Sequence, residues 1–166
     1  MTQYRVGIIG CGNIFPMHSI SISRQESAKL MAVCDIKEER AKAKAKEYNC
    51  PYYLDYQKMI DQADLDVVHI CTPHHLHAPM AIYAANQGVH VLTEKPMSIG
   101  LADAYAMIDA AEKNGVVLGV IFQNRYNPGS KLVKEMLESG QLGRIISSKL
   151  SVTWNRSDEY YSKSDW

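Results

Sequence analysis

The stretch GIIGCGNIFP, residues 7–16, places three glycines within six residues, directly after a short apolar run, and a proline follows. Gly10 and Gly12 fill the first two positions of a G-x-G-x-x-G pattern, but Phe15 stands at the third, where a glycine or alanine is usual. The stretch predicts a strand, a tight turn and the start of a helix. The surrounding sequence has to decide between a dinucleotide-binding loop and an ordinary turn.

Short runs rich in Val, Ile and Leu recur along the chain, separated by segments of helical character. Continuous apolar runs are typical of strands buried on both faces, and each separating segment is long enough to connect two parallel strands. This order predicts a doubly wound α/β fold, a parallel sheet with helices on both faces. The expected strands are 4–10, 29–35, 65–72, 88–94 and 115–122, with a weaker one at 52–54 and a short helix at 56–62.

The pattern changes after Phe122. A helix closed by Gly140 is expected there, followed by a longer, partly alternating strand over GRIISSKLSVTWN, residues 143–155. Residues 123–166 are too few for an independent core. We therefore expect residues 1–122 to form one domain and residues 123–166 to begin a second, incomplete α/β domain, so that the chain is the front part of a longer protein.

The glycine loop fits a dinucleotide site when it lies between a strand and a helix. Gly10 permits the tight turn, and Gly12 lets backbone amides approach a diphosphate at the positive end of the helix. Pro16 suits the first helical turn, where its missing N–H loses nothing. Phe15 predicts either a slightly displaced helix or a ring turned away from the sheet.

An acidic residue, Asp35, closes the second expected strand. A carboxylate in this place accepts hydrogen bonds from both hydroxyls of an adenosine ribose and repels a 2′-phosphate. NAD is therefore favoured over NADP, although Lys37 softens the repulsion. The alternative is that Asp35 only caps the following helix.

Composition limits the remaining classes of function. Among the 166 residues, 18 basic and 18 acidic side chains cancel, so no overall field attracts nucleic acid or an anionic membrane. No apolar stretch is long enough to span a bilayer, and the polar start does not resemble a signal peptide. We expect a cytoplasmic protein with a small-molecule partner. Its cysteines form no C-x-x-C pair and are expected as free, mostly buried thiols: Cys11, Cys34, Cys50 and Cys71.

Chemically dense segments follow the fourth and fifth expected strands, with the weaker strand at 52–54 counted as the third, at the sheet edge where ligands of parallel sheets bind. The fourth strand ends in CTPHHLH and the fifth in TEKP. Lys95, held before Pro96, can bind a substrate hydroxyl beside a nicotinamide and relay its proton. The alternative is a solvated surface lysine. The neighbouring histidines lack a zinc-site spacing, so no metal is expected.

The segments GIIGCGNI, AVCD, CTPHHLH and HVLTEKP, in this order, resemble the glucose-fructose oxidoreductase/inositol dehydrogenase/MocA (Gfo/Idh/MocA) family, and EKP is the most specific of them. The resemblance covers nearly the whole chain. It implies an NAD(P)-dependent oxidoreductase acting on a sugar, sugar derivative or cyclitol. It also implies an N-terminal Rossmann domain and a second α/β domain that carries much of the substrate pocket and a homo-oligomer interface.

The resemblance also assigns roles to single residues, with Lys95 as the catalytic one. Phe15 departs from the family pattern, and the family's second catalytic motif, D-x-x-x-H, is absent. We therefore expect this chain to bind the cofactor but to turn over little substrate. The implied cofactor-binding residues are Gly10, Gly12, Asn13, Ile14, Asp35, Thr72, Pro73, His77, Glu94 and Arg125.

Two other classes of function stay open. The first is a non-catalytic dinucleotide-binding sensor or regulatory module with the same fold. The second is a methyltransferase, which also uses a glycine-rich loop. The methyltransferase is disfavoured because Ile14 occupies the third glycine of its G-x-G-x-G form and TEKP has no role in it.

Overall fold

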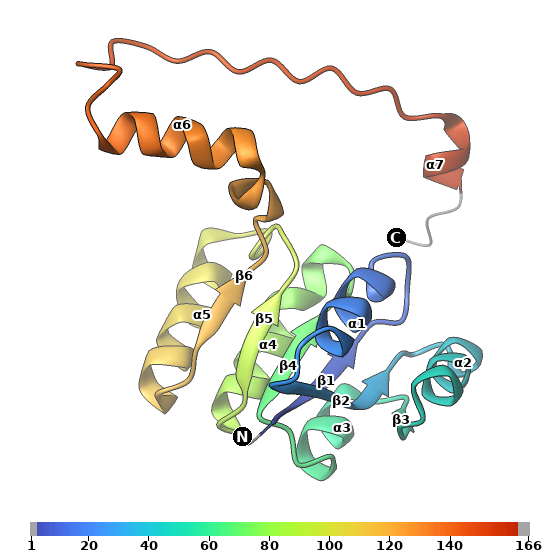
Figure 1. Ribbon diagram of the computed structural model, residues 1–166. Helices are drawn as coiled ribbons and strands as arrows, with labels where there is room; N and C mark the ends of the chain where they lie inside the picture. The colour runs from blue at the N-terminus through green and yellow to red at the C-terminus, as the bar shows by residue number, and fades with distance from the viewer. Residues whose placement is uncertain (1–2, 163–166) are drawn as a thin grey trace. The chain divides into compact units, whose positions relative to one another are not determined.

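The computed structural model describes residues 3–162 and divides the chain into two compact units, with the division after Ile121. The first unit is an α/β sandwich (Figure 1). Its strands are β1 (Tyr4–Ile9), β2 (Ala28–Cys34), β3 (Tyr52–Tyr53), β4 (Val67–Ile70), β5 (His90–Thr93) and β6 (Leu118–Val120). Its helices are α1 (Phe15–Ser23), α2 (Glu38–Tyr48), α3 (Tyr56–Gln62), α4 (His77–Asn86) and α5 (Leu101–Asn114), with a 3-10 turn, η1 (His74–Leu76).

The six strands form one sheet in the order β3-β2-β1-β4-β5-β6, and every neighbouring pair is parallel. The predicted doubly wound α/β fold is confirmed. The strand order reverses direction between β1 and β4, which is the point where such sheets open a crevice beyond their carboxyl ends. The glycine loop follows β1 and therefore lies at this crevice.

Two apolar layers cover the sheet because alternate strand residues face opposite sides. Ile8 and Val33 pack with Phe15 on the side of α1 and α2. Val68 and Ile70 pack on the other side with residues of α3, α4 and α5. The continuous apolar runs in the sequence thus correspond to strands covered on both faces, as their composition indicates.

Of the two alternatives predicted for Phe15, the ring turned away from the sheet is wrong. The ring is not turned away from the sheet: it is fully buried, packs with Ile8 and Val33, and meets the Tyr48 ring edge-on with centroids 5.7 Å apart. A large aromatic side chain at this position fills the space between α1, α2 and the sheet, so it supplies core volume where a glycine would supply none.

The second unit begins at Phe122 and contains η2 (Gln123–Tyr126), α6 (Pro128–Glu138) and α7 (Asp158–Ser162). None of its described residues, 122–162, is buried. The predicted helix before Gly140 is confirmed as α6, but the strand expected over residues 143–155 is wrong, because these residues form no strand. A strand needs a neighbour for its backbone hydrogen bonds, and here the apolar Ile146 and Leu150 stay 92% and 89% exposed.

The four cysteines are free thiols; Cys11, Cys34 and Cys71 are buried and Cys50 is half-buried. No helix within residues 3–162 combines the length and the apolar character needed to cross a bilayer.

Candidate functional site

The glycine loop after β1 is held by close backbone contacts to two neighbouring strand ends. Gly10 has a φ of +99° and donates its amide to the carbonyl of Cys34, at 2.7 Å. A side chain at Gly10 would place its Cβ 2.6 Å from the carbonyl oxygen of Cys71, closer than real contacts allow. Only glycine fits this turn, both for its left-handed backbone and for the space.

Gly12, by contrast, faces open space. An added Cβ would meet no heavy atom within 4 Å, and the following Asn13 and Ile14 are exposed. Helix α1 begins immediately afterwards at Phe15, with Pro16 in its first turn as predicted. The positive end of α1 and the backbone of Gly12 to Ile14 therefore border an open volume at the carboxyl edge of the sheet, a place suited to an anion.

The carboxylate of Asp35 links the glycine loop to the start of α2. Its Oδ2 accepts the amide of Cys11 at 2.8 Å, and its Oδ1 accepts the amide of Lys37 at 2.8 Å. Lys37, not Asp35, is the N-cap residue of α2. Asp35 is therefore not the cap of α2 itself. One of its oxygens accepts the amide of the N-cap residue, Lys37, and the other accepts the amide of Cys11 in the glycine loop.

The thiols beside Asp35 carry no charge at neutral pH. Burial, together with the nearby carboxylate of Asp35, raises the pKa of Cys11 and of Cys34 to about 12.

The segment after β4 is tied to the segment after β5 through His77. This side chain is fully buried; its Nδ1 lies 2.8 Å from the carbonyl oxygen of Pro96 and its Nε2 lies 2.9 Å from that of Thr72. Pro73 is the residue that precedes η1. Both ring nitrogens of His77 therefore lie within hydrogen-bond distance of backbone carbonyls, and the residue joins the loops that follow β4 and β5.

The segment after β5 carries Glu94 and Lys95, and the Lys95–Pro96 peptide bond is cis. Lys95 is exposed, whereas the Glu94 side chain is only 13% exposed. Glu94 Oε2 accepts the amide of Lys95 at 3.2 Å, and Oε1 lies 3.1 Å from Nε2 of His18. Glu94 therefore connects the Lys95 backbone to helix α1.

The structure adds two site residues that the sequence analysis missed, His18 and His69. His18 lies on α1 and is buried, and its Nδ1 is 3.1 Å from Nδ1 of His69 on β4. Burial, and secondarily the neighbouring His18, lowers the pKa of His69 to about 4. The available signal was a histidine inside the apolar run VVHI, at a position that faces α1.

Arg125 belongs to the second unit, where its guanidinium lies over the ring of Phe122 at 5.3 Å from the centroid. Its expected approach to the cofactor stays a prediction.

The first unit brings the glycine loop, Asp35, Thr72, Glu94 and Lys95 to the carboxyl edge of one sheet. Within residues 3–162, no group of three or more His, Cys, Asp or Glu side chains is placed to hold a metal ion.

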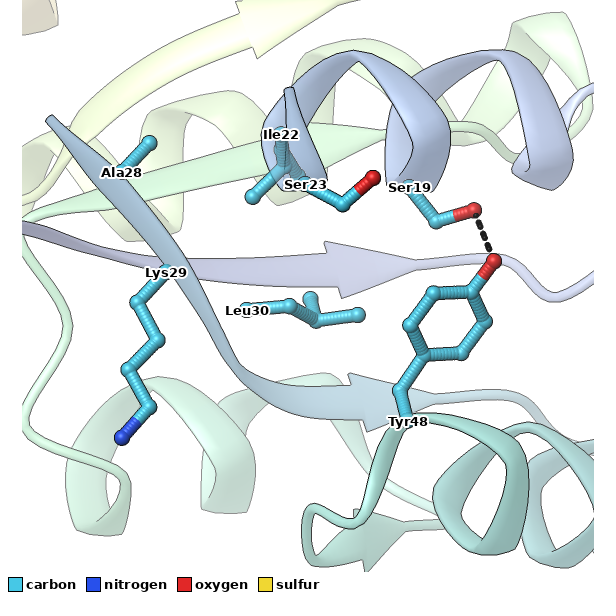
Figure 2. Close-up of a pocket in the computed structure, with 7 residues that line it drawn as sticks. All are labelled: Ser19, Ile22, Ser23, Ala28, Lys29, Leu30 and Tyr48. Atoms are coloured by element: carbon cyan, nitrogen blue, oxygen red, sulfur yellow. Dashed lines mark hydrogen bonds between the residues drawn. The ribbon is translucent and has the colours of Figure 1, made fainter. Parts of the chain in front are cut away.

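A separate cavity of about 220 Å³ lies between α1, the start of β2 and the end of α2, as Figure 2 shows. The hydroxyls of Ser19 and Tyr48 meet across it at 2.8 Å. Lys29 and Leu30 line it from the amino end of β2, whereas Asp35 follows the carboxyl end of that strand. This cavity is therefore distinct from the carboxyl edge of the sheet, where the predicted site residues of the first unit lie.

Comparison with known proteins identifies the family. Residues 4–122 match the Gfo/Idh/MocA family, described as an oxidoreductase family with an NAD-binding Rossmann fold. The chain belongs to this family. The resemblance stated from the motifs is confirmed, and NAD, the expected cofactor, agrees with the family description.

Individual relatives are dehydrogenases. The chain is 31% identical to the myo-inositol 2-dehydrogenase of Thermotoga maritima over 84% of this chain and 42% of that protein. It is 34% identical to the D-glucoside 3-dehydrogenase of Escherichia coli over 85% and 41%. The chain spans less than half the length of these curated relatives.

A solved structure matches the fold over nearly the whole chain. The WlbA dehydrogenase of Bordetella pertussis, crystallised with NADH and UDP-GlcNAcA, is 34% identical to it. Its TM-score is 0.95, over 99% of this chain and 48% of that one. The Rossmann-type assignment of the first unit is thereby confirmed.

Proposed function

We propose that the protein is an NAD-dependent dehydrogenase. It transfers a hydride between the nicotinamide and a carbon that bears a hydroxyl or ketone in a sugar, sugar derivative or cyclitol. The observation that carries the proposal is the meeting of three loops at one edge of the sheet: the open backbone at Gly12, the carboxylate of Asp35, and the Glu94–Lys95 segment. Ligands of open parallel sheets bind at this edge.

The adenosine half of the cofactor fits the β1 and β2 ends. Backbone amides near Gly12 and the positive end of α1 favour a diphosphate, and no heavy atom fills the space in front of Gly12. Each oxygen of Asp35 accepts one amide, but a carboxylate has about four acceptor sites. Asp35 therefore keeps acceptor capacity for the two ribose hydroxyls.

The reacting half of the cofactor is assigned to the β5 end. The nicotinamide supplies the hydride chemistry, while the protein supplies orientation and charge. Lys95, exposed beside the half-buried Glu94, would hold the substrate oxygen and exchange its proton. The inositol and glucoside dehydrogenases among the relatives support a polyhydroxylated substrate.

Substitution of Gly12 separates cofactor binding from folding. In Gly12→Ala the added methyl group meets no protein atom, so the urea midpoint should match that of the parent chain. The methyl group would occupy the space assigned to the diphosphate, so the dissociation constant for NADH should rise about tenfold or more, which is about 1.4 kcal/mol. The measurement is a titration of NADH fluorescence.

Gly129→Ala is the matched control, because its added Cβ also meets nothing within 4 Å, in the second unit. NADH affinity should be unchanged in this control. Equal affinities for Gly12→Ala and the parent chain, or no saturable NADH binding by the parent chain, would remove the cofactor assignment.

Substitution of Lys95 tests the chemical half. In the longer protein that the sequence analysis expects, assayed with NAD⁺ and a panel of cyclitols and sugars, Lys95→Ala should lower kcat by roughly two or more orders of magnitude, the scale of acid–base groups. Its NADH affinity should stay within about twofold of the parent value. Cofactor binding by the longer protein without turnover of any panel member would favour the sensor or regulatory module over the dehydrogenase.

A further inference from the structure

Three side chains that are distant in sequence form a polar chain next to Lys95, in which His18 is buried and His69 and Glu94 are half-buried. His18 comes from α1, His69 from β4 and Glu94 from the end of β5. His18 is central: its Nε2 lies 3.1 Å from Glu94 Oε1 and its Nδ1 lies 3.1 Å from Nδ1 of His69. The two imidazole rings meet edge-on, with centroids 5.2 Å apart.

Hydrogen-bond chemistry fixes the protons of this chain. An ionised carboxylate only accepts, so Nε2 of His18 carries the proton that it donates to Glu94. The contact between the two Nδ1 atoms holds one proton, because one nitrogen has to donate and the other accept. His69 is neutral at physiological pH, since burial, and secondarily His18, lowers its pKa to about 4.

The same carboxylate also faces the chain segment that carries the lysine. Glu94 Oε2 accepts the backbone amide of Lys95, while Oε1 is held by His18. The Cys71 thiol, from the end of β4, lies near enough for Glu94 to contribute to its raised pKa, although burial contributes more. The neutral thiol and the two donors leave the carboxylate as a fixed acceptor between α1 and the Lys95 backbone.

We propose that His18 is the positioning residue of Lys95. By donating to one oxygen of Glu94, it orients the other oxygen toward the Lys95 amide and so fixes the backbone from which the lysine projects. His69 holds the His18 ring in the orientation that this donation needs. The inference rests on the proposed dehydrogenase function for its effect on catalysis, but the hydrogen-bond chain itself is testable without turnover.

Two substitutions at His18 separate the effect of losing the hydrogen-bond donor to Glu94 from the effect of losing the imidazole ring. His18→Leu removes the donor to Glu94. His18→Gln keeps an N–H near the position of Nε2 but provides no imidazole. His90→Asn is the control, since His90 lies at the opposite end of the sheet and accepts the Val117 amide through Nδ1, an atom that the Asn side-chain oxygen can replace.

Nuclear magnetic resonance of the 166-residue chain tests the hydrogen-bond chain directly. The parent should show a coupling between His18 Nδ1 and His69 Nδ1 through their shared proton. The Lys95 amide signal should shift in His18→Leu, stay close to the parent position in His18→Gln, and not move in His90→Asn. The proposal would be overturned if no coupling joins His18 Nδ1 and His69 Nδ1. It would also be overturned if the Lys95 amide signal is unchanged in a folded His18→Leu variant.

Kinetics of the longer protein in the dehydrogenase assay supply the second readout. His18→Leu should lower kcat about tenfold to a hundredfold, as expected for a slightly displaced catalytic group, with NADH affinity and KM close to the parent values. His18→Gln should recover most of the lost kcat. If the kcat of His18→Gln is as low as that of His18→Leu, the proposal that the N–H donor of His18 positions Lys95 would be overturned. If the longer protein turns over no substrate, the proposed function fails, and the magnetic resonance result still decides the positioning role.

Discussion

The two units of the chain use their apolar residues differently. In the first, both faces of the sheet are covered, and strand residues such as Ile8 and Val68 are fully buried. In the second, α6 carries apolar side chains that remain roughly half exposed: Leu132, Val133 and Leu137. A sequence pattern therefore defines which face of an element is apolar, but that face becomes part of a core only where other elements of the chain pack against it. The stability of the chain should reside in residues 1–121.

Matched isoleucine truncations give the largest expected contrast. Ile8→Ala opens a cavity in the core beneath α1 and should cost about 2–5 kcal/mol of unfolding free energy. Ile146→Ala, at a side chain that is 92% exposed, should change it by less than about 0.5 kcal/mol. Urea unfolding followed by far-ultraviolet circular dichroism measures both. Similar losses in the two variants would show that the second unit has a core of its own.

The first unit was predictable from sequence because its signals are local. The apolar runs predict all six strands in parallel order, and Tyr56–Gln62 is the expected short helix. Glycines and prolines also fix the loop geometry, since Gly10 adopts a left-handed φ and Pro16 lies in the first turn of α1. The strand expected over 143–155 failed because alternation does not provide a hydrogen-bonding partner.

The candidate site was predictable only where a motif marks it. Gly12, Asp35 and Lys95 are found by their place after strands, and the structure brings their loops to one edge of the sheet. His18 was missed because its partners lie 51 and 76 residues away in the sequence, and no local spacing connects them. The burial of the Phe15 ring was not predicted because its neighbours across the helix–sheet interface, among them Tyr48, are not part of the glycine pattern.

Acid should destabilise the first unit through His69. Its pKa is about 4 in the folded chain, against 6.5 for a free histidine, because burial and then His18 disfavour the charged ring. Below pH 6.5 the unfolded chain binds a proton that the folded chain does not, so stability falls as the pH drops from 6.5 to 4. The total loss is on the order of 3 kcal/mol, and it is complete below about pH 4.

Urea unfolding at a series of pH values measures this loss, and His69→Asn should remove most of it while keeping a polar partner for His18. Residues 122–166 contain both tryptophans and no histidine. Tryptophan emission should therefore not follow the His69 titration, whereas the circular dichroism of the first unit should. An unchanged pH dependence in His69→Asn would assign the effect to another group.

Paired glycine substitutions at helix ends give the smallest effect and the finest test of the contrast. Gly115 ends α5 and Gly140 follows α6; both have positive φ, +65° and +73°, and an added Cβ would meet nothing within 4 Å of either. Alanine at each therefore costs backbone strain alone, about 1 kcal/mol.

Gly115→Ala should lower the unfolding free energy by this amount, because α5 buries Met107 and Ala111 against the sheet. Gly140→Ala should leave the urea midpoint of the core unchanged and only speed amide hydrogen exchange in the last turn of α6. Equal shifts of the midpoint would mean that the two units unfold as one cooperative structure.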